Sequence, residues 1–332
     1  MIQGIVVLSF FRIVVMKKNF ASRMSRGLFK AVCCLVLFFL PVPEAAASGP
    51  YPNSHFATVD NLKLHYRVWE PGAETVKGNV LLVHGFSGST FSWEEVADSL
   101  SRLGYRVVAA DVPPFGYSDR KPRQNQSVTA RATLFNAFLE DRFPGKQWHI
   151  AGHSMGGGIV QAMALMEPER FASVCFVAPT LFQKTEQGRR GAPPLWLRIP
   201  GLTTFAGHLA ESWFLTENRI RTSLASAYGE SPSQEQVEAY LEPLAVPGTA
   251  RAILNSARFS KELASLDVEN FSVPALAVWG ENDTWVSLAS RREIAESIAG
   301  LQLEVIEDAG HNPMETHFDP FMTLWLTFLN NL

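Results

Sequence analysis

The residue with the clearest chemical potential is Ser154, at the centre of the pentapeptide GHSMG, residues 152–156. An apolar run ends just before the serine, and a stretch of helical length, residues 157–166, follows it. A sharp turn from strand to helix holds such a serine in strained backbone geometry, and the flanking glycines leave room for neighbouring backbone. We therefore predict that Ser154 is a nucleophile. The alternative is a glycine-rich turn in which the serine caps a helix.

A serine hydroxyl attacks efficiently only when a base removes its proton and a third group orients that base. His311, in DAGHNP, is the predicted base, because it follows the last apolar run of the chain. Asp283, in WGENDTWV, is the predicted acid, with Glu281 as the alternative. His153 adjoins the serine, but we favour His311, which lies where a loop can return a histidine to the site. The order serine, aspartate, histidine differs from the orders in two other serine-protease folds.

A glycine-rich loop, VHGFSGS at residues 83–89, follows another apolar run and adds the fourth part of this site. The backbone N–H groups of Phe86 and Met155 are the predicted oxyanion hole, which would stabilise the charge that develops on a carbonyl oxygen. We expect His84 to support the loop by hydrogen bonding. The histidine spacing shows no metal-binding motif, and we expect neither a metal nor a cofactor.

Six short apolar runs are predicted to be the strands that position these groups. Each run is apolar on both faces, which suits buried strands of a parallel sheet. Amphipathic stretches lie between several of them; in the first, Val96, Leu100 and Leu103 share one stripe. Alternating strands and helices predict a doubly wound, mostly parallel α/β sheet. The predicted strands are residues 79–85, 105–111, 147–153, 172–179, 273–280 and 301–308, and the predicted helices include 91–104, 129–143 and 290–300.

Two segments depart from this alternation. Residues 55–72 alternate in polarity around an Asp-Asn pair, which predicts an antiparallel hairpin at the edge of the sheet. From about residue 181 to residue 270 the strand pattern disappears and proline-rich and helical segments take its place. We interpret residues 181–270 as a helical cap inserted into one core, which comprises residues 48–180 and 271–332.

Five segments, in this order and spacing, make the chain resemble the α/β-hydrolase superfamily over roughly residues 55–331: HGFSGSTFSW, DVPPFGYSD, GHSMGG, GENDTWV and DAGHNP. The resemblance implies that fold and a triad of Ser154, Asp283 and His311, and it favours the capped, esterase- and lipase-like branch with a serine nucleophile. Pro114 stands where many relatives have glycine. Haloalkane dehalogenases and epoxide hydrolases, which use an aspartate nucleophile, fit less well because position 154 is serine.

The first 47 residues are predicted to be a signal peptide. They carry six basic side chains and one acid, and the apolar run AVCCLVLFFL is followed by small residues up to Ala47. An uncleaved signal anchor is the alternative, and Met16 or Met24 is a more natural start than Met1. We expect an exported protein, periplasmic or secreted, with membrane attachment only if this segment is retained.

Removal of residues 1–47 changes the charge and the cysteine content. The whole chain has 29 basic and 32 acidic residues, whereas the remainder has 23 and 31, a net charge of −8. An acidic protein without a basic stripe argues against nucleic acid as a partner. Cys175 would be the one cysteine left, so no intramolecular disulfide forms, and its apolar surroundings predict a buried, inert thiol.

The predicted triad favours hydrolysis of carboxylic esters through an acyl-enzyme, on a small molecule with an apolar acyl or aryl group. Four cap residues, Trp196, Leu197, Trp213 and Phe214, would either line such a pocket or pack between cap and sheet. The family also includes C–C bond hydrolases, thioesterases, lactonases, aminopeptidases and haloperoxidase-like enzymes, and the fold does not choose among them. A non-catalytic binding protein is a third hypothesis, which the intact triad disfavours.

Overall fold

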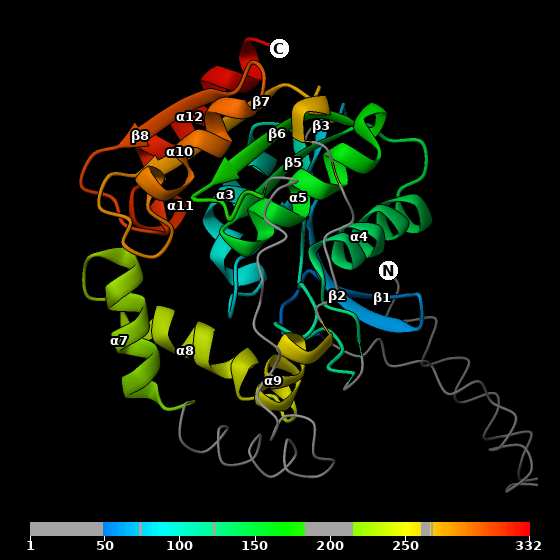
Figure 1. Cartoon of the computed structure of the whole chain (residues 1–332). Coiled ribbons are helices and arrows are strands. Elements are labelled where there is room, and N and C mark those ends of the chain that lie inside the picture. The colour runs from blue at the N-terminus through cyan, green and yellow to red at the C-terminus, as the bar shows by residue number, and fades with distance from the viewer. Residues whose placement is uncertain (1–48, 73–74, 122–123, 183–214, 260–265, 267) are drawn as a thin grey trace, which may run out of the picture. The chain divides into compact units, whose positions relative to one another are not determined.

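The computed structural model describes residues 49–332 except 73–74, 122–123, 183–214, 260–265 and 267 (Figure 1). Its eight strands form one sheet in the order β1-β2-β4-β3-β5-β6-β7-β8. β2 runs antiparallel to both of its neighbours, β1 and β4, and the remaining pairs of adjacent strands are parallel. The strands are β1 (Ser54–Val59), β2 (Leu62–Trp69), β3 (Gly78–Val83), β4 (Tyr105–Ala110), β5 (Trp148–His153), β6 (Phe171–Val177), β7 (Ala275–Gly280) and β8 (Gln302–Ile306).

Helices cover both faces of this sheet. One face packs against α4, α5 and α10, whose apolar residues join the larger buried cluster. The other face packs against α3 and α12, which contribute Leu100, Phe321 and Trp325 to the second cluster. This is the predicted doubly wound α/β architecture. The helices outside the segment after β6 are α3 (Glu94–Arg102), α4 (Val128–Arg142), α5 (Met155–Met166), α10 (Leu288–Ser297), α11 (Pro313–Thr316) and α12 (Phe318–Asn330), with short 3₁₀ turns that include Thr90–Trp93.

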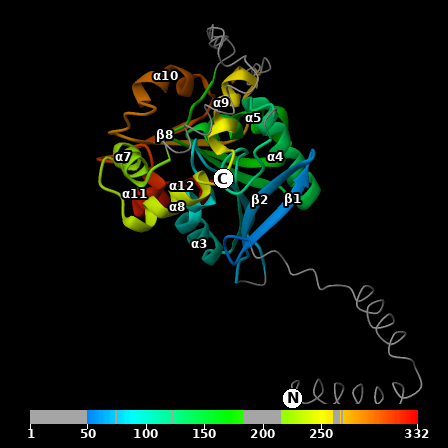
Figure 2. The ribbon, with the colours of Figure 1, turned by 90° about the horizontal axis from the view of Figure 1, so that it is seen from below.

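The predicted hairpin is present at one edge of the sheet. β1 and β2 pair in register from Ser54 with Arg67 to Val59 with Leu62. Asp60 and Asn61 connect them with φ angles of 48° and 61°. Aspartate and asparagine tolerate positive φ at both central turn positions, so the tight two-residue turn follows from these residue types. In Figure 2 the hairpin and β8 lie at opposite edges of the sheet.

Three α-helices occupy the described part of the segment predicted to be a cap: α7 (Glu217–Tyr228), α8 (Gln234–Leu244) and α9 (Thr249–Phe259). They connect β6 to β7 and lie together on one side of the molecule (Figure 1). Ser233 caps the N-terminus of α8: its side chain accepts a hydrogen bond from Gln236 N–H, and the Gln236 side chain accepts one from Ser233 N–H. The boundaries 181 and 270 stay a prediction, and the four apolar cap residues named above lie outside the described residues.

Other expectations differ from the structure in detail. β8 is not a buried strand but an exposed edge, with Val305 46% exposed, because β8 pairs only with β7. Leu103 is 38% exposed rather than on the buried stripe, because α3 already ends at Arg102. Cys175 is buried, as predicted, and burial raises the pKa of its thiol. The N-terminal segment lies outside the described residues, among which no helix is long and apolar enough to cross a membrane.

The packing of α5 against β3 gives a prediction about stability. A Cβ at Gly156 would lie 2.3 Å from the Val83 carbonyl oxygen, whereas one at Gly72 would meet nothing within 4 Å. We expect Gly156→Ala to lower the free energy of unfolding by about 1–3 kcal/mol or more, because backbone must move. Gly72→Ala should change it by less than about 0.5 kcal/mol. Urea unfolding measures both, and an equal effect of the two substitutions would contradict the packing described here.

Candidate functional site

Ser154 lies on a strained turn between β5 and α5. Its backbone has φ 51° and ψ −116°, and a non-glycine residue adopts such angles only when its surroundings impose them. The Ser154 N–H donates to the Val177 carbonyl at 2.9 Å. Its own carbonyl accepts from the N–H groups of Gly157 and Thr180, each at 2.9 Å, and from the Thr180 hydroxyl at 3.1 Å. Four hydrogen bonds therefore hold the serine in this conformation.

Glycines allow neighbouring backbone to approach this turn closely. A Cβ at Gly152 would lie 2.4 Å from the Gly156 carbonyl oxygen, and one at Gly85 would lie 3.1 Å from the Ser154 Cβ. These positions correspond to the glycines of the pentapeptide and of the loop after β3. The loop predicted to hold the oxyanion donors is thus adjacent to Ser154.

Asp283 and His311 come together at the carboxyl ends of β7 and β8. The His311 Nδ1 and Asp283 Oδ2 are 2.8 Å apart, and their side chains are 4% and 1% exposed. Asp283 Oδ1 accepts from the N–H groups of Trp285 and Val286 at 2.8 and 3.0 Å. Because Asp283 only accepts when ionised, His311 donates from Nδ1 and leaves Nε2 able to take a proton. Glu281 instead accepts from Asp308 N–H at 3.3 Å and does not contact the imidazole.

His153 connects the serine turn to the His311 loop. Its Nε2 lies 2.9 Å from the His311 carbonyl oxygen, so this nitrogen carries a proton and donates. The two imidazole rings are 4.7 Å apart. Burial, and to a lesser extent His311, lower the pKa of His153 well below its usual value, so it is neutral. The sequence suggested only that His153 was a poor choice of base; its contact with the His311 backbone was not predicted.

The backbone N–H groups of the two predicted oxyanion donors make no hydrogen bond among the described residues. Outside the helices and strands, no hydrogen bond between described residues uses Phe86 N–H or Met155 N–H. Met155 is the first residue of α5, and the first N–H groups of a helix have no partner within it. Ser154 Oγ makes no hydrogen bond to His311 Nε2 in the described part of the chain. Such contacts are often loose without a bound substrate.

His84 supports the loop of Phe86, as expected. Its Nδ1 donates to the Gly85 carbonyl at 2.7 Å and its Nε2 accepts from Val112 N–H at 2.8 Å. Burial lowers its pKa, with Asp111 opposing that effect. A neutral imidazole is the one form that can donate and accept at once, so both hydrogen bonds and the lowered pKa agree.

A second set of hydrogen-bonded serine, histidine and aspartate side chains lies near the hairpin. Ser54 Oγ is 2.8 Å from His65 Nε2, and His65 Nδ1 is 2.6 Å from Asp111 Oδ2. Asp111 also accepts from Thr90 N–H and Tyr117 N–H, each at 2.7 Å. Burial would raise the pKa of Asp111, but the hydrogen bonds, chiefly from His65, outweigh it and lower the pKa. Asp111 therefore fixes two loops, and Ser54, the first residue of β1, lacks the strained turn of Ser154.

The helices after β6 contact the His311 loop directly. Ala227, in α7, accepts a hydrogen bond from His311 N–H at 2.6 Å. Trp285 stacks on the His311 ring at 5.8 Å and donates to the hydroxyl of Ser226 at 3.2 Å. A Cβ at Gly310 would lie 2.4 Å from the Ala227 carbonyl oxygen, so this approach needs glycine. The position of the imidazole thus depends on α7 as well as on the sheet.

A half-buried carboxylate, Glu315, joins two of these helices to α11. It accepts from the hydroxyls of Tyr228 and Tyr240 at 2.8 and 2.7 Å and from the Asn312 amide at 2.7 Å. Burial raises the pKa of Glu315, and these hydrogen bonds oppose the rise. Because three donors converge on one carboxylate, α7 and α8 are fixed to the residues that follow His311.

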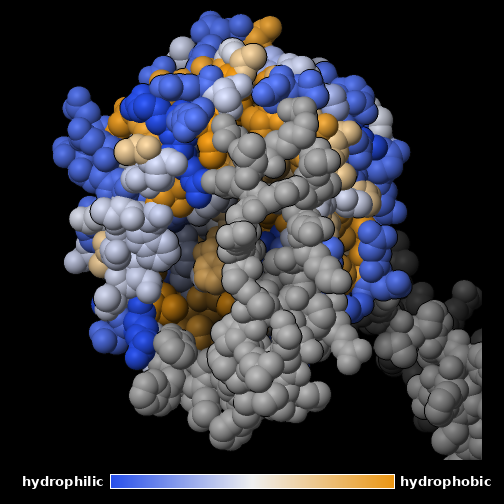
Figure 3. All heavy atoms as spheres, in the orientation of Figure 1, coloured by the Kyte–Doolittle hydropathy of each residue, from blue (hydrophilic) through white to orange (hydrophobic). Residues whose placement is uncertain are grey.

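Arg120 connects the core to the other end of this helical segment, at α8 and the start of α9. Its guanidinium donates to Ser118 O at 2.6 Å in the core, and to Pro243 O at 2.8 Å and Thr249 Oγ1 at 2.7 Å beyond β6. In Figure 3 apolar residues, in orange, lie beside the recess between these helices and the sheet. The recess is therefore bordered by helices that hydrogen bonds fix to the core at both ends.

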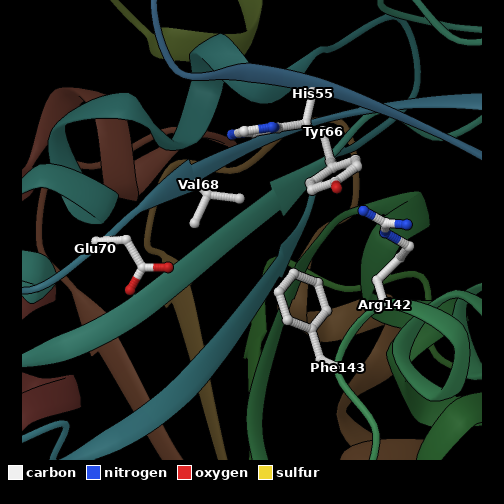
Figure 4. Close-up of a pocket in the computed structure, with 6 residues that line it drawn as sticks. All are labelled: His55, Tyr66, Val68, Glu70, Arg142 and Phe143. Atoms are coloured by element: carbon white, nitrogen blue, oxygen red, sulfur yellow. The ribbon is translucent and has the colours of Figure 1, made fainter.

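A separate hollow of about 330 Å³ lies against the hairpin (Figure 4). It belongs to the opposite side of β2 from His65, because its lining residues Tyr66 and Val68 alternate with His65 along the strand. None of the predicted catalytic residues lines it, so it is not the site that Ser154 and His311 define. Its lining residues are His55, Tyr66, Val68, Glu70, Arg142 and Phe143.

The sheet order and the turn at Ser154 define an α/β protein in which Ser154, Asp283 and His311 follow the carboxyl ends of strands. The family model described as the alpha/beta hydrolase fold matches residues 78–318. The chain belongs to the alpha/beta hydrolase family.

Two relatives and one solved structure illustrate the similarity. An uncharacterized hydrolase, YugF, from Bacillus subtilis is 28% identical over 258 residues, covering 76% of this chain and 89% of that protein. A 2-hydroxy-6-oxononadienedioate/2-hydroxy-6-oxononatrienedioate hydrolase from Pseudomonas putida is 27% identical over 302 residues, covering 84% and 97%. The crystal structure of a probable hydrolytic enzyme from Pseudomonas aeruginosa PAO1 has a TM-score of 0.68 at 20% identity, covering 83% and 93%. By fold and by the names of its relatives, the protein is a hydrolase.

The geometry of the two acids gives a prediction. Asp283→Asn should lower kcat by about 10³–10⁴-fold, because an amide at this position no longer fixes the tautomer that leaves Nε2 free. Glu281→Gln is the matched control and should change kcat by only a few fold, since Glu281 bonds a backbone N–H away from the imidazole. Steady-state kinetics on an activated ester compare them. A larger loss in Glu281→Gln would transfer the role of orienting acid to Glu281.

Proposed function

We propose that the protein is a serine hydrolase that cleaves carboxylic esters through an acyl-enzyme. Ser154 Oγ attacks the ester carbonyl carbon while His311 Nε2 accepts the hydroxyl proton. Asp283 holds the imidazole and stabilises its protonated form, and the N–H groups of Phe86 and Met155 bind the developing oxyanion. His311 then gives the proton to the leaving alcohol. A water molecule, deprotonated by His311, attacks the acyl-enzyme and releases the acid.

One observation supports this proposal most strongly. Asp283 and the main chain of Ala227 fix His311 from two directions, at 2.8 and 2.6 Å, and leave its Nε2 without a hydrogen bond among the described residues. The strained serine turn contacts the same loop through His153. Nucleophilic catalysis by a serine requires an oriented imidazole nitrogen that is free to take the hydroxyl proton.

A C–C bond hydrolase with the same three residues is the second candidate. The relative from Pseudomonas putida, named a hydrolase of 2-hydroxy-6-oxononadienedioate, supports it because the similarity extends over nearly its whole length. The two candidate functions use the same triad and differ in the substrate bond that is cleaved, an ester C–O bond or a C–C bond. Parallel assays of p-nitrophenyl esters of increasing chain length and of a 2-hydroxy-6-oxo-dienoate separate them by their ratio of kcat/KM.

The role of Ser154 is tested by comparing its substitution with that of Ser54, the other serine that lies in a set with histidine and aspartate. We expect a fluorophosphonate probe to label the protein, and Ser154→Ala to abolish labelling and lower ester turnover by several orders of magnitude. Ser54→Ala is the matched control: it removes a serine hydroxyl that lies 2.8 Å from a histidine nitrogen, and it should retain both labelling and turnover. Labelling that persists in folded Ser154→Ala would refute the assignment. Circular dichroism checks that each variant is folded.

We also propose that the protein is exported. The basic residues, the apolar run AVCCLVLFFL and the small residues up to Ala47 support cleavage of a signal peptide. N-terminal sequencing of protein recovered from a bacterial periplasm or medium should begin at Ser48. An intact chain in the membrane fraction would indicate a retained anchor, and an intact chain in the cytosol would contradict export.

A further inference from the structure

Arg131 is a buried cation without an acidic partner. Its residue is 6% exposed, and no carboxylate of the described residues lies within 4.0 Å of its guanidinium. Nη1 points at the Met155 sulfur at 3.0 Å, Nη2 reaches Gln126 Oε1 at 3.3 Å, and Nε has no partner. Burial lowers its pKa to about 10, so the group is still charged near neutral pH. An uncompensated buried charge is costly and calls for an anion.

The local backbone also favours an anion at this position. Arg131 lies in the first turn of α4, which begins at Val128, and Met155 is the first residue of α5. Helix N-termini carry partial positive charge, which disfavours a second cation and attracts negative groups. Two helix N-termini and one guanidinium therefore all favour a negatively charged group beside Arg131.

That region adjoins the proposed reaction centre. Met155 supplies one predicted oxyanion N–H, and the Arg131 guanidinium touches the side chain of the same residue. A thioether sulfur is a weak acceptor on a flexible side chain, so a carboxylate can displace it. Gln126 in turn donates to Ala252 O in α9 at 3.1 Å, which connects this region to the helices after β6.

We propose that Arg131 binds a carboxylate of the substrate, so that the protein prefers monoesters of dicarboxylic acids, or esters with a carboxylate on the leaving group, over neutral esters of the same shape. This inference rests on the proposed serine hydrolase function. The fork of N–H groups on arginine suits a planar carboxylate, and a charge-assisted hydrogen bond in a buried site is strong enough to select substrates.

The test compares two matched pairs of substrates on the full mature protein. The first pair is mono-p-nitrophenyl glutarate and its neutral methyl ester; the second is 4-butyryloxybenzoate and its methyl ester. We expect wild type to have the higher kcat/KM for the carboxylate member of at least one pair. Arg131→Met should lower the ratio of carboxylate to neutral kcat/KM on the order of 10–100-fold. Arg131→Lys should lower it less, because it keeps the charge and loses the fork.

Arg142→Met is the control variant, because Arg142 is an exposed arginine in the last turn of the same helix, and its ratio should equal that of wild type. A purely structural role for Arg131 would lower both members of a pair in proportion and leave the ratio unchanged, which would overturn the proposal. Preference for the neutral member in both pairs of wild type would overturn it without any variant.

A second measurement separates this proposal from the serine mechanism. Glutarate, but not dimethyl glutarate, should slow fluorophosphonate labelling of wild type, and Arg131→Met should lose that protection. Normal labelling without protection and without a change in the substrate ratio refutes the role of Arg131 alone. Absence of labelling and of turnover for all four esters refutes the proposed function itself.

Discussion

The strained backbone of Ser154 is the constraint on which the rest of the site depends. Its φ of 51° is maintained by the hydrogen bond that its N–H donates to Val177 in β6 and by those that its carbonyl accepts from Gly157 and Thr180, so the serine cannot relax without breaking these bonds. The same turn brings Gly156 against the backbone of β3, where a side chain has no space. Contacts with three neighbouring strands, β3, β5 and β6, therefore hold the strained turn, and the parallel sheet stabilises a backbone conformation that would otherwise relax.

The imidazole is positioned by a different set of contacts, and these reach outside the sheet. His311 donates from its main chain to Ala227 in α7, while its ring contacts the rings of His153 and Trp285. Glu315 and its tyrosine partners fix α7 and α8 to the next turn of chain. The segment after β6 thus helps to position the predicted base and also borders the recess. A change in that segment would therefore move His311 itself as well as change access to the recess.

The sequence predicted the sheet well because its signals are local. Apolar runs located the inner strands, and the Asp-Asn pair located the hairpin turn, since both depend on neighbouring residues. An apolar run does not reveal whether a strand has one neighbour or two, which is why β8 was expected to be buried. The residues of the predicted triad were found from motif and order, and the structure brings Asp283 and His311 together, but their catalytic roles stay a prediction. Contacts such as Ala227 with His311 were not predicted, because they join backbone atoms 84 residues apart and leave no pattern in the sequence.

Four buried histidines illustrate why hydrogen-bond partners, rather than adjacency in sequence, support His311 as the proposed base. His65 is bonded at both nitrogens, to Ser54 and Asp111, and His84 is likewise bonded at both. His153 adjoins the serine, but burial lowers its pKa so far that it is a poor proton acceptor, and its Nε2 is already a donor. His311 combines an ionic partner at Nδ1 with an Nε2 that makes no hydrogen bond to a described residue. Proton transfer requires both conditions at once, and among these four histidines His311 alone meets them.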